Sequence, residues 1–257
     1  MFSKCTRPDD LLLQCRNICF AELGSGGFST LAASSFALHV AEAGHTVCYT
    51  ECDVPSEKVW LLYDSVAMDR RFERSGFVDF YSLAEEGMKM HTYSNREKGV
   101  NWRLITPDNI KNQVKLTPLQ MSRLVFSARA DVCIFDLGSC REYDMLLEDM
   151  DAVIFFVDPM PSKIVNGYER LSFMQKKFAN GFPHIWAVHN ADAGISKREI
   201  KNMIRDRDIC WINEISRREI YIAEYRCRFP WEMGSVRNAF EEFFVSEIGR
   251  ASCRERV

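Results

Sequence analysis

A glycine-rich turn, between an apolar run and a helix-like segment, has the residue types needed to bind phosphate. It reads Gly24-Ser25-Gly26-Gly27, and Ser29 and Thr30 follow at the expected start of the helix. Glycines let the backbone curl with its N–H groups pointing inward, and the positive end of a helix attracts an anion. We therefore predict a phosphate site at this turn, with the Ser29 hydroxyl as a candidate Mg²⁺ ligand.

The cation expected beside such a turn is missing. In the P-loop pattern G-x-x-x-x-G-K-[ST], the lysine reaches the β- and γ-phosphates of a nucleotide. Phe28 stands at the lysine position and Glu22 at the position of the first glycine. A phenyl ring and a carboxylate thus replace an ammonium and a flexible turn. The sequence keeps the geometry of a nucleotide site and loses much of its charge.

Two later apolar runs end in polar residues suited to the same site. Val132-Cys133-Ile134-Phe135 is followed by Asp136, and Gly138 comes two residues later. This is the form of a Walker B strand, in which the carboxylate holds the water shell of Mg²⁺. The run from His184 ends in Asn190, a residue type that also caps turns after a strand.

The run Leu23 to Thr30, with Glu51-Cys52-Asp53 at the end of the next predicted strand, resembles a known family. It is similar to the deviant Walker A family of ParA and MinD type ATPases, which includes the TadZ/CpaE pilus-localisation proteins. Their motif is K-G-G-x-G-K-[ST]-[ST], followed by a helix and a strand ending in D-x-D. Both lysines are replaced here, by Leu23 and Phe28, so the match is to a degenerate P-loop.

The resemblance assigns roles to particular residues. It implies that ATP is contacted by Gly24, Ser25, Gly26, Gly27, Phe28, Ser29, Thr30 and Asn190, and that Mg²⁺ is held by Ser29 and Asp136. Asp53 stands where the family positions the attacking water, and it is the candidate catalytic residue; it is equally suited to capping a helix after Pro55. Because each missing charge-assisted contact removes about 1.5–3 kcal/mol, we expect ATP and Mg²⁺ to bind weakly or not at all.

The rest of the chain alternates strand-like and helix-like segments, which predicts one α/β domain with a mostly parallel sheet and helices on both faces. The expected strands are 17–21, 46–51, 102–106, 132–136, 152–157, 184–190 and 209–212, and the clearest helices are 29–43, 118–128, 162–178 and 197–205. We place an N-terminal extension at 1–16 and the P-loop NTPase-like domain at 17–246. Residues 247–257 resemble a translated sequencing adapter and are expected to be non-native.

The amino-acid composition limits which partners and which cellular location are expected. The 257 residues carry a formal net charge of −3 without a block of lysine or arginine, so there is no strong signal for nucleic-acid binding. No run approaches about 18 apolar residues, and the N-terminus lacks the plan of a signal peptide. We expect a cytoplasmic protein whose scattered cysteines are reduced core residues, and membrane association stays open.

These features favour a pseudo-ATPase that acts as a scaffold or spatial regulator in pilus or secretion localisation, with a protein partner or a homodimer. The alternative is a working Mg-ATP-dependent ATPase whose positive charge comes from elsewhere, with Lys58, Arg70, Arg71 and Arg141 as candidates. A dinucleotide-binding Rossmann enzyme fits less well. Its third glycine would fall at position 29, which is Ser29.

Overall fold

An eight-stranded sheet forms the centre of the molecule in the computed structural model, which describes residues 16–24, 26–52, 61–69, 72–73, 76–190, 194–206 and 209–244. Its strands are β1 (Asn17–Glu22), β2 (Val47–Glu51), β5 (Arg96–Glu97), β6 (Val100–Arg103), β7 (Val132–Gly138), β8 (Ala152–Val157), β9 (His184–Val188) and β10 (Ile209–Trp211). The order is β10-β9-β8-β1-β7-β2-β6-β5, and only β5 runs antiparallel to its neighbour. β3 (Met68–Asp69) and β4 (Phe72–Glu73) form a separate pair.

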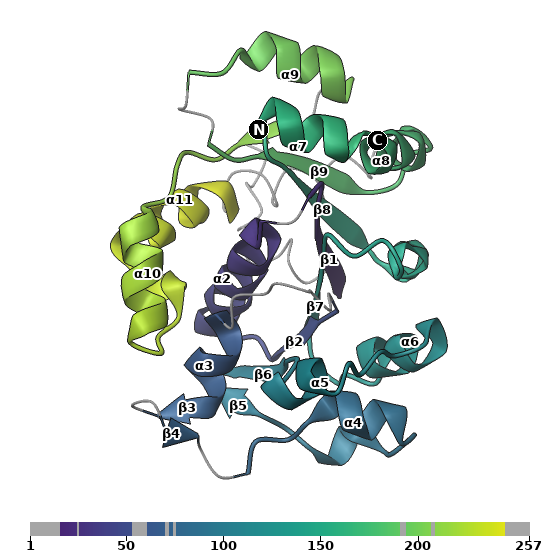
Figure 1. Ribbon diagram of the computed structural model, residues 1–257, viewed down its shortest axis with the longest axis vertical. Helices are drawn as coiled ribbons and strands as arrows, with labels where there is room; N and C mark the ends of the chain where they lie inside the picture. The colour runs from purple at the N-terminus through teal and green to yellow at the C-terminus, as the bar shows by residue number, and fades with distance from the viewer. Residues whose placement is uncertain are drawn as a thin grey trace, which may run out of the picture.

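Helices cover both faces of this sheet (Figure 1). One face carries α2 (Phe28–Glu42), α3 (Leu61–Ala67), α10 (Arg217–Tyr225), η3 (Pro230–Glu232) and α11 (Gly234–Phe243). The other carries α4 (Phe80–Glu85), α5 (Pro107–Lys111), α6 (Pro118–Phe126), α7 (Pro161–Asn166), α8 (Tyr168–Ala179) and α9 (Lys197–Ile204). Two short helices, η1 (Met90–Thr92) and η2 (Asp144–Asp149), complete the set among the described residues. The predicted α/β class is confirmed.

The strands expected at 17–21, 132–136 and 152–157 lie at the centre of the sheet. β1 lies between β8 and β7, and their apolar residues are buried on both faces, as expected for parallel strands under helices. Side chains alternate between the faces: Phe20 packs on the α2 side and Ala21 on the other. Glu22 follows Phe20 by two positions, so its side chain also points toward α2.

One predicted helix is divided. The pattern at 162–178 predicted a single helix, but α7 ends at Asn166 and α8 begins at Tyr168. The break is at Gly167, where a Cβ would lie 2.5 Å from Leu23 Cγ and 3.0 Å from the Leu23 carbonyl oxygen. The end of β1 approaches this residue closely, a contact that periodicity does not encode.

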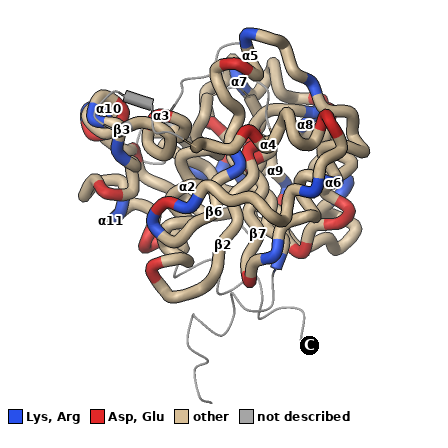
Figure 2. Tube along the Cα trace, turned by 90° about the horizontal axis from the view of Figure 1, so that it is seen from below, with Lys and Arg blue, Asp and Glu red and all other residues tan. Residues whose placement is uncertain are grey.

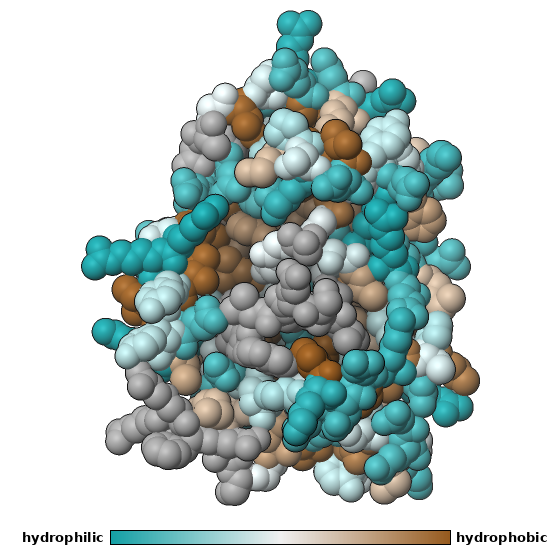
Figure 3. Space-filling model, viewed as in Figure 1, coloured by the Kyte–Doolittle hydropathy of each residue, from teal (hydrophilic) through white to brown (hydrophobic). Residues whose placement is uncertain are grey.

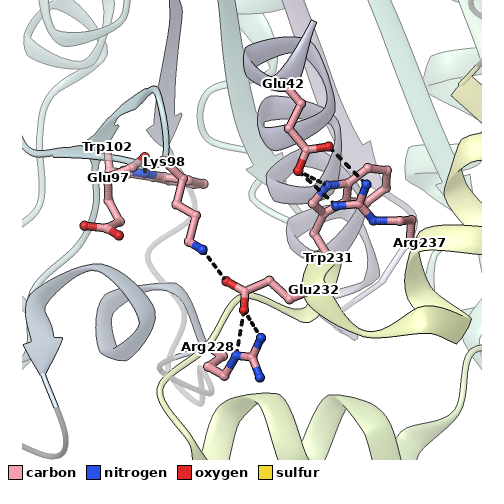
Figure 4. Close-up of polar contacts among 8 residues, drawn as sticks. All are labelled: Glu42, Glu97, Lys98, Trp102, Arg228, Trp231, Glu232 and Arg237. Atoms are coloured by element: carbon pink, nitrogen blue, oxygen red, sulfur yellow. Dashed lines mark hydrogen bonds and ion pairs between the residues drawn. The ribbon is translucent and has the colours of Figure 1, made fainter.

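The C-terminal elements are fastened to α2 by an aromatic and ionic cluster (Figure 4). The Arg237 guanidinium lies 4.5 Å from the ring centre of Trp231 and donates to both carboxylate oxygens of Glu42 at the end of α2. Trp231 Nε1 donates to the same carboxylate at 3.1 Å, and its ring is buried. These contacts hold η3 and α11 over the α2 face of the sheet.

The surface is polar and mixed in charge. Acidic and basic positions are interspersed in the view of Figure 2. Hydrophilic residues cover most of the face shown in Figure 3, where apolar side chains gather in a recess. Among the described helices, none has the length and apolar character needed to cross a membrane.

Candidate functional site

The glycine turn lies at the carboxyl edge of the sheet, between the end of β1 and the start of α2. Gly27 has a φ of 71°, a left-handed conformation that glycine adopts without a steric penalty, and α2 begins at the next residue. Ser29 Oγ lies 3.2 Å from an Asp136 carboxylate oxygen. The turn and the end of β7 are therefore neighbours, as the motif spacing predicted.

The Glu22 carboxylate fills the turn from beneath. Its Oε1 accepts hydrogen bonds from the backbone N–H groups of Gly26 and Gly27, both at 3.0 Å. Its Oε2 accepts from those of Phe28 and Ser29, both at 3.1 Å. We call these four N–H groups the anion nest. Consecutive inward N–H groups at a helix N-terminus are the donors that phosphate-binding turns present.

The environment of Glu22 contains opposing electrostatic effects. Burial raises the pKa of its carboxyl, while the hydrogen bonds from Ser29 and Gly27 lower it and the neighbouring Asp136 raises it. Hydrogen bonds to a charged acceptor contribute about 1.5–3 kcal/mol each, and a buried carboxylate without them is strongly disfavoured. Four backbone donors are what make a buried side chain, 6% exposed, tolerable at this position.

Asp136 is fully buried and accepts three hydroxyl groups. Ser29 Oγ donates to Oδ1 at 3.2 Å, and Thr30 Oγ1 and Tyr49 Oη donate to Oδ2 at 2.5 and 2.9 Å. Burial, together with the charge of Asp136, raises the pKa of the Tyr49 hydroxyl, so this group stays a neutral donor. Ser29 and Asp136 have the oxygen donors that Mg²⁺ prefers, and they are adjacent.

Phe28 is part of an aromatic cluster. Its ring stacks on the His189 ring, with centres 4.2 Å apart and planes at 10°, and it lies against Phe156 and Phe240 at 5.5 and 5.8 Å. The residue at the position of the phosphate-binding lysine is thus packed between β8, the end of β9 and α11.

Leu23, at the other lysine position, is also a packing residue. Its side chain is 4% exposed and lies against Gly167, while its backbone N–H donates to the Phe156 carbonyl at 2.9 Å. The apolar side chains at the two lysine positions therefore both pack against other parts of the protein. Leu23 is buried in the core, and Phe28 is partly buried against it.

A cation that the sequence reasoning missed lies beside the turn. Lys163 Nζ, from α7, is 3.4 Å from the place that a Cβ on Gly26 would take, and it pairs with Asp158 at 3.1 Å. His189 Nε2 is 3.9 Å from the same carboxylate. Burial lowers the pKa of His189, although Asp158 raises it. Lys163 carries no motif, and only the fold of α7 over the sheet edge brings it here.

Arg170, on α8, joins the two loops that flank the site. It is buried, and its Nη1 donates to the carbonyl oxygens of Glu22 at 2.8 Å and Gly138 at 3.2 Å. Its Nη2 pairs with Asp144 at 2.9 Å. The end of β1 and the loop after β7 are thereby held in one arrangement.

The structure describes some of the remaining predicted residues and leaves others out. Asn190 follows β9 in a left-handed conformation with φ of 55°, a backbone geometry typical of a turn. Arg141 pairs with Glu169 at 3.3 Å. Other candidates from the sequence, Ser25, Asp53, Lys58, Arg70 and Arg71, lie outside the described residues.

The anion nest does not fit a bound phosphate in this arrangement, because its four N–H groups already donate to Glu22. A phosphate needs the same donors, and it would meet two carboxylates, those of Glu22 and Asp136. The oxygen pair of Ser29 and Asp136 fits Mg²⁺, whereas the phosphate that normally accompanies the metal has no free position.

Sheet order, a glycine turn after the central strand and a carboxylate at the end of β7 define the P-loop NTPase class of fold. Within it, the fold is similar to ParA and MinD proteins. A ParA family ATPase from Chlorobium tepidum TLS superposes with a TM-score of 0.66 at 15% identity, covering 94% of this chain and 99% of that one.

Two further solved structures show the same likeness. MinD in the MinC:MinD cell division complex of Aquifex aeolicus gives a TM-score of 0.62 at 12% identity, with 93% and 95% coverage. An ATP complex of a Cyanothece McdA variant gives 0.60 at 13%, with 95% and 98% coverage. No protein-family model and no curated protein sequence matches the chain, so the likeness is one of fold.

Proposed function

We propose that this chain is a scaffold or spatial regulator with a ParA/MinD fold, whose hydrolysis of ATP is very slow or absent. The observation that carries the proposal is the packing of both lysine positions, with Leu23 against Gly167 and Phe28 on His189. Phosphoryl transfer spreads negative charge over the phosphate oxygens, and side chains built into the apolar interior cannot stabilise it.

The solved structures support a role in positioning. The similar proteins include a ParA family ATPase and MinD, which is seen in complex with MinC. By analogy, this chain acts through a protein partner, or as a homodimer, at a defined place in the cell. The resemblance of its glycine turn to the TadZ/CpaE proteins favours pilus or secretion localisation as the setting.

The direct test is hydrolysis by the purified chain with Mg-ATP in excess. We expect no turnover above that of Asp136→Asn, which keeps the shape of the side chain but loses its charge. Turnover on the order of 1 s⁻¹, within the usual enzymatic range, that disappears in Asp136→Asn would contradict the proposal. In cells, a fluorescent fusion should keep its position when Asp136 is replaced in the same way.

A second candidate is an ATPase with relocated charge, and Lys163 is the observation in its favour. Its ammonium lies beside Gly26 and is paired with Asp158 at 3.1 Å. If Lys163 serves as the phosphate-binding cation, Lys163→Met should abolish ATP binding and turnover. Under the scaffold proposal, Lys163→Met and the wild-type protein behave alike in both assays.

A further inference from the structure

We propose that Glu22 is an internal anion that takes the place of a phosphate in the nest and keeps it closed to polyphosphate ligands. The inference deepens the proposed function and rests on it, since it names what controls the same site. Its basis is geometric: each carboxylate oxygen accepts two backbone N–H groups from the residues 26–29, at 3.0 to 3.1 Å.

The fold places this carboxylate rigidly. Glu22 is the last residue of β1, and its side chain emerges on the α2 face beneath the first turn of that helix. The Arg170 guanidinium holds its carbonyl at 2.8 Å, and the next N–H, that of Leu23, is bonded to β8. With the backbone fixed on both sides of the residue, the carboxylate needs little ordering to reach the nest.

A polyphosphate must therefore displace a tethered group before it binds. Its apparent dissociation constant equals the intrinsic one divided by the fraction of molecules in which the nest is open. An ionised Glu22 that stayed nearby would repel the ligand, as Asp136 does. Removing the Glu22 carboxylate eliminates the competition and one of the two negative charges.

The ligand class follows from the donors. Four N–H groups at the start of a 15-residue helix suit a tetrahedral oxyanion, and Lys163 Nζ at the rim beside Gly26 adds a cation for a second phosphoryl group. Pyrophosphate is the smallest probe with both features. It also lacks the base and ribose, so it reports on the nest alone.

The experiment compares wild-type protein, Glu22→Ala and Glu22→Gln in titrations with pyrophosphate, followed by calorimetry and by thermal shift. Glu51→Ala is the matched control. Glu51 has the same 6% exposure, ends the strand β2 at the same sheet edge, and its carboxylate accepts the Ile105 N–H at 2.9 Å. It lies outside the nest.

We expect Glu22→Ala to bind pyrophosphate at least tenfold more tightly than wild type. The variant should melt at a lower temperature than wild type, and pyrophosphate should restore part of that difference. Glu22→Gln, whose amide NH₂ cannot accept from the nest, should fall between. Glu51→Ala should lose stability without gaining affinity. A folded Glu22→Ala that binds no better than wild type overturns the proposal.

A measurement on the unaltered protein tests the proposal even if the variants fail to fold. Hydrogen exchange of the peptide amides at 26–29 should be slow without any ligand, because Glu22 accepts all four. Fast exchange there overturns the proposal. Turnover by the wild-type protein would refute both proposals, because ATP would then have to enter the nest. Unchanged pyrophosphate affinity in the Glu22 variants would refute only this one.

Discussion

At the scale of single residues, the site is defined by what replaces the two lysines. Phe28 is partly buried and packs against aromatic rings, and Leu23 is buried, so a lysine at either position would replace an apolar packing contact. Restoring a lysine is therefore a packing change as well as a charge change, and the two effects oppose each other.

We expect Phe28→Lys to destabilise the fold by about 1–3 kcal/mol, which is less than the cost of removing a fully buried Phe because this ring is partly exposed. ATP affinity should not rise while Glu22 fills the nest. Denaturant unfolding and ATP titration measure the two effects. Phe28→Leu is the control, since it keeps an apolar side chain and should cost less. A stable Phe28→Lys that gains affinity would show that Phe28 is not a packing residue.

The His189 imidazole should make stability depend on pH. Burial lowers its pKa in the folded state below the value of about 6.5 for an exposed histidine, with Asp158, Lys163 and Asn190 as the polar groups facing it. Below pH 6.5 the unfolded chain takes up a proton that the folded chain resists. The stability supplied by the neutral ring is thus present above pH 6.5 and falls as the pH drops toward the folded pKa.

The measurement is denaturant unfolding from pH 7.5 to 5.5, comparing wild type with His189→Phe, which retains a ring against Phe28. We expect the wild-type protein to lose more stability over this range than the variant. Equal slopes for the two proteins would mean that His189 is protonated as easily in the fold as outside it.

At the scale of elements, the junction between α7 and α8 depends on one close approach. Gly167 has an ordinary φ of −94°, so its requirement for glycine comes from Leu23 and not from backbone conformation. Gly167 is also the residue at which the helix predicted over 162–178 is divided, and its contact with Leu23 links the end of β1 to the helices that carry Lys163 and Arg170.

Gly167→Ala should therefore destabilise the protein by about 1–3 kcal/mol through overpacking against Leu23. Gly234→Ala, where no atom lies within 4 Å of the new Cβ, is the matched control and should be neutral or slightly stabilising. The double variant Leu23→Ala with Gly167→Ala should cost less than the sum of the two single changes. Strict additivity in thermal or denaturant unfolding would contradict the contact.

At the scale of the whole molecule, the fold is similar to that of ParA and MinD proteins, and the elements around the glycine turn are held by the chain's own side chains. Glu22 closes the nest, the hydroxyls of Ser29, Thr30 and Tyr49 saturate Asp136, and Arg170 bridges the ends of β1 and β7. These contacts link the glycine turn, the end of β7 and α8.

A ligand that binds only the folded state stabilises it by about 2.7 kcal/mol at a hundred times its dissociation constant. We expect millimolar Mg-ATP to leave the melting temperature of the wild-type protein unchanged. Differential scanning fluorimetry with and without Mg²⁺ checks this, with pyrophosphate and the Glu22→Ala variant as the positive comparison. A clear upward shift in wild type would show a nucleotide site in use.

The sequence by itself determined the fold class, the central strands and the place of the glycine turn beside Asp136. These follow from local signals: uninterrupted apolar runs, helical spacing and glycines at a strand end. It also showed which residues had replaced the lysines. The linear pattern assigned Glu22 no more than the position of a missing glycine.

Only the tertiary structure decided what those replacements do. The contact of Glu22 with the N–H groups at 26–29, the position of Lys163 beside Gly26 and the packing of Leu23 on Gly167 join segments whose separation in the chain varies from a few residues to more than a hundred. Hydrophobic spacing specifies which face of an element is buried. The full packing of the sheet and its helices decides which side chain from a distant element contacts that face. In this protein the packing places a carboxylate of the chain itself in the position where the motif would bind phosphate.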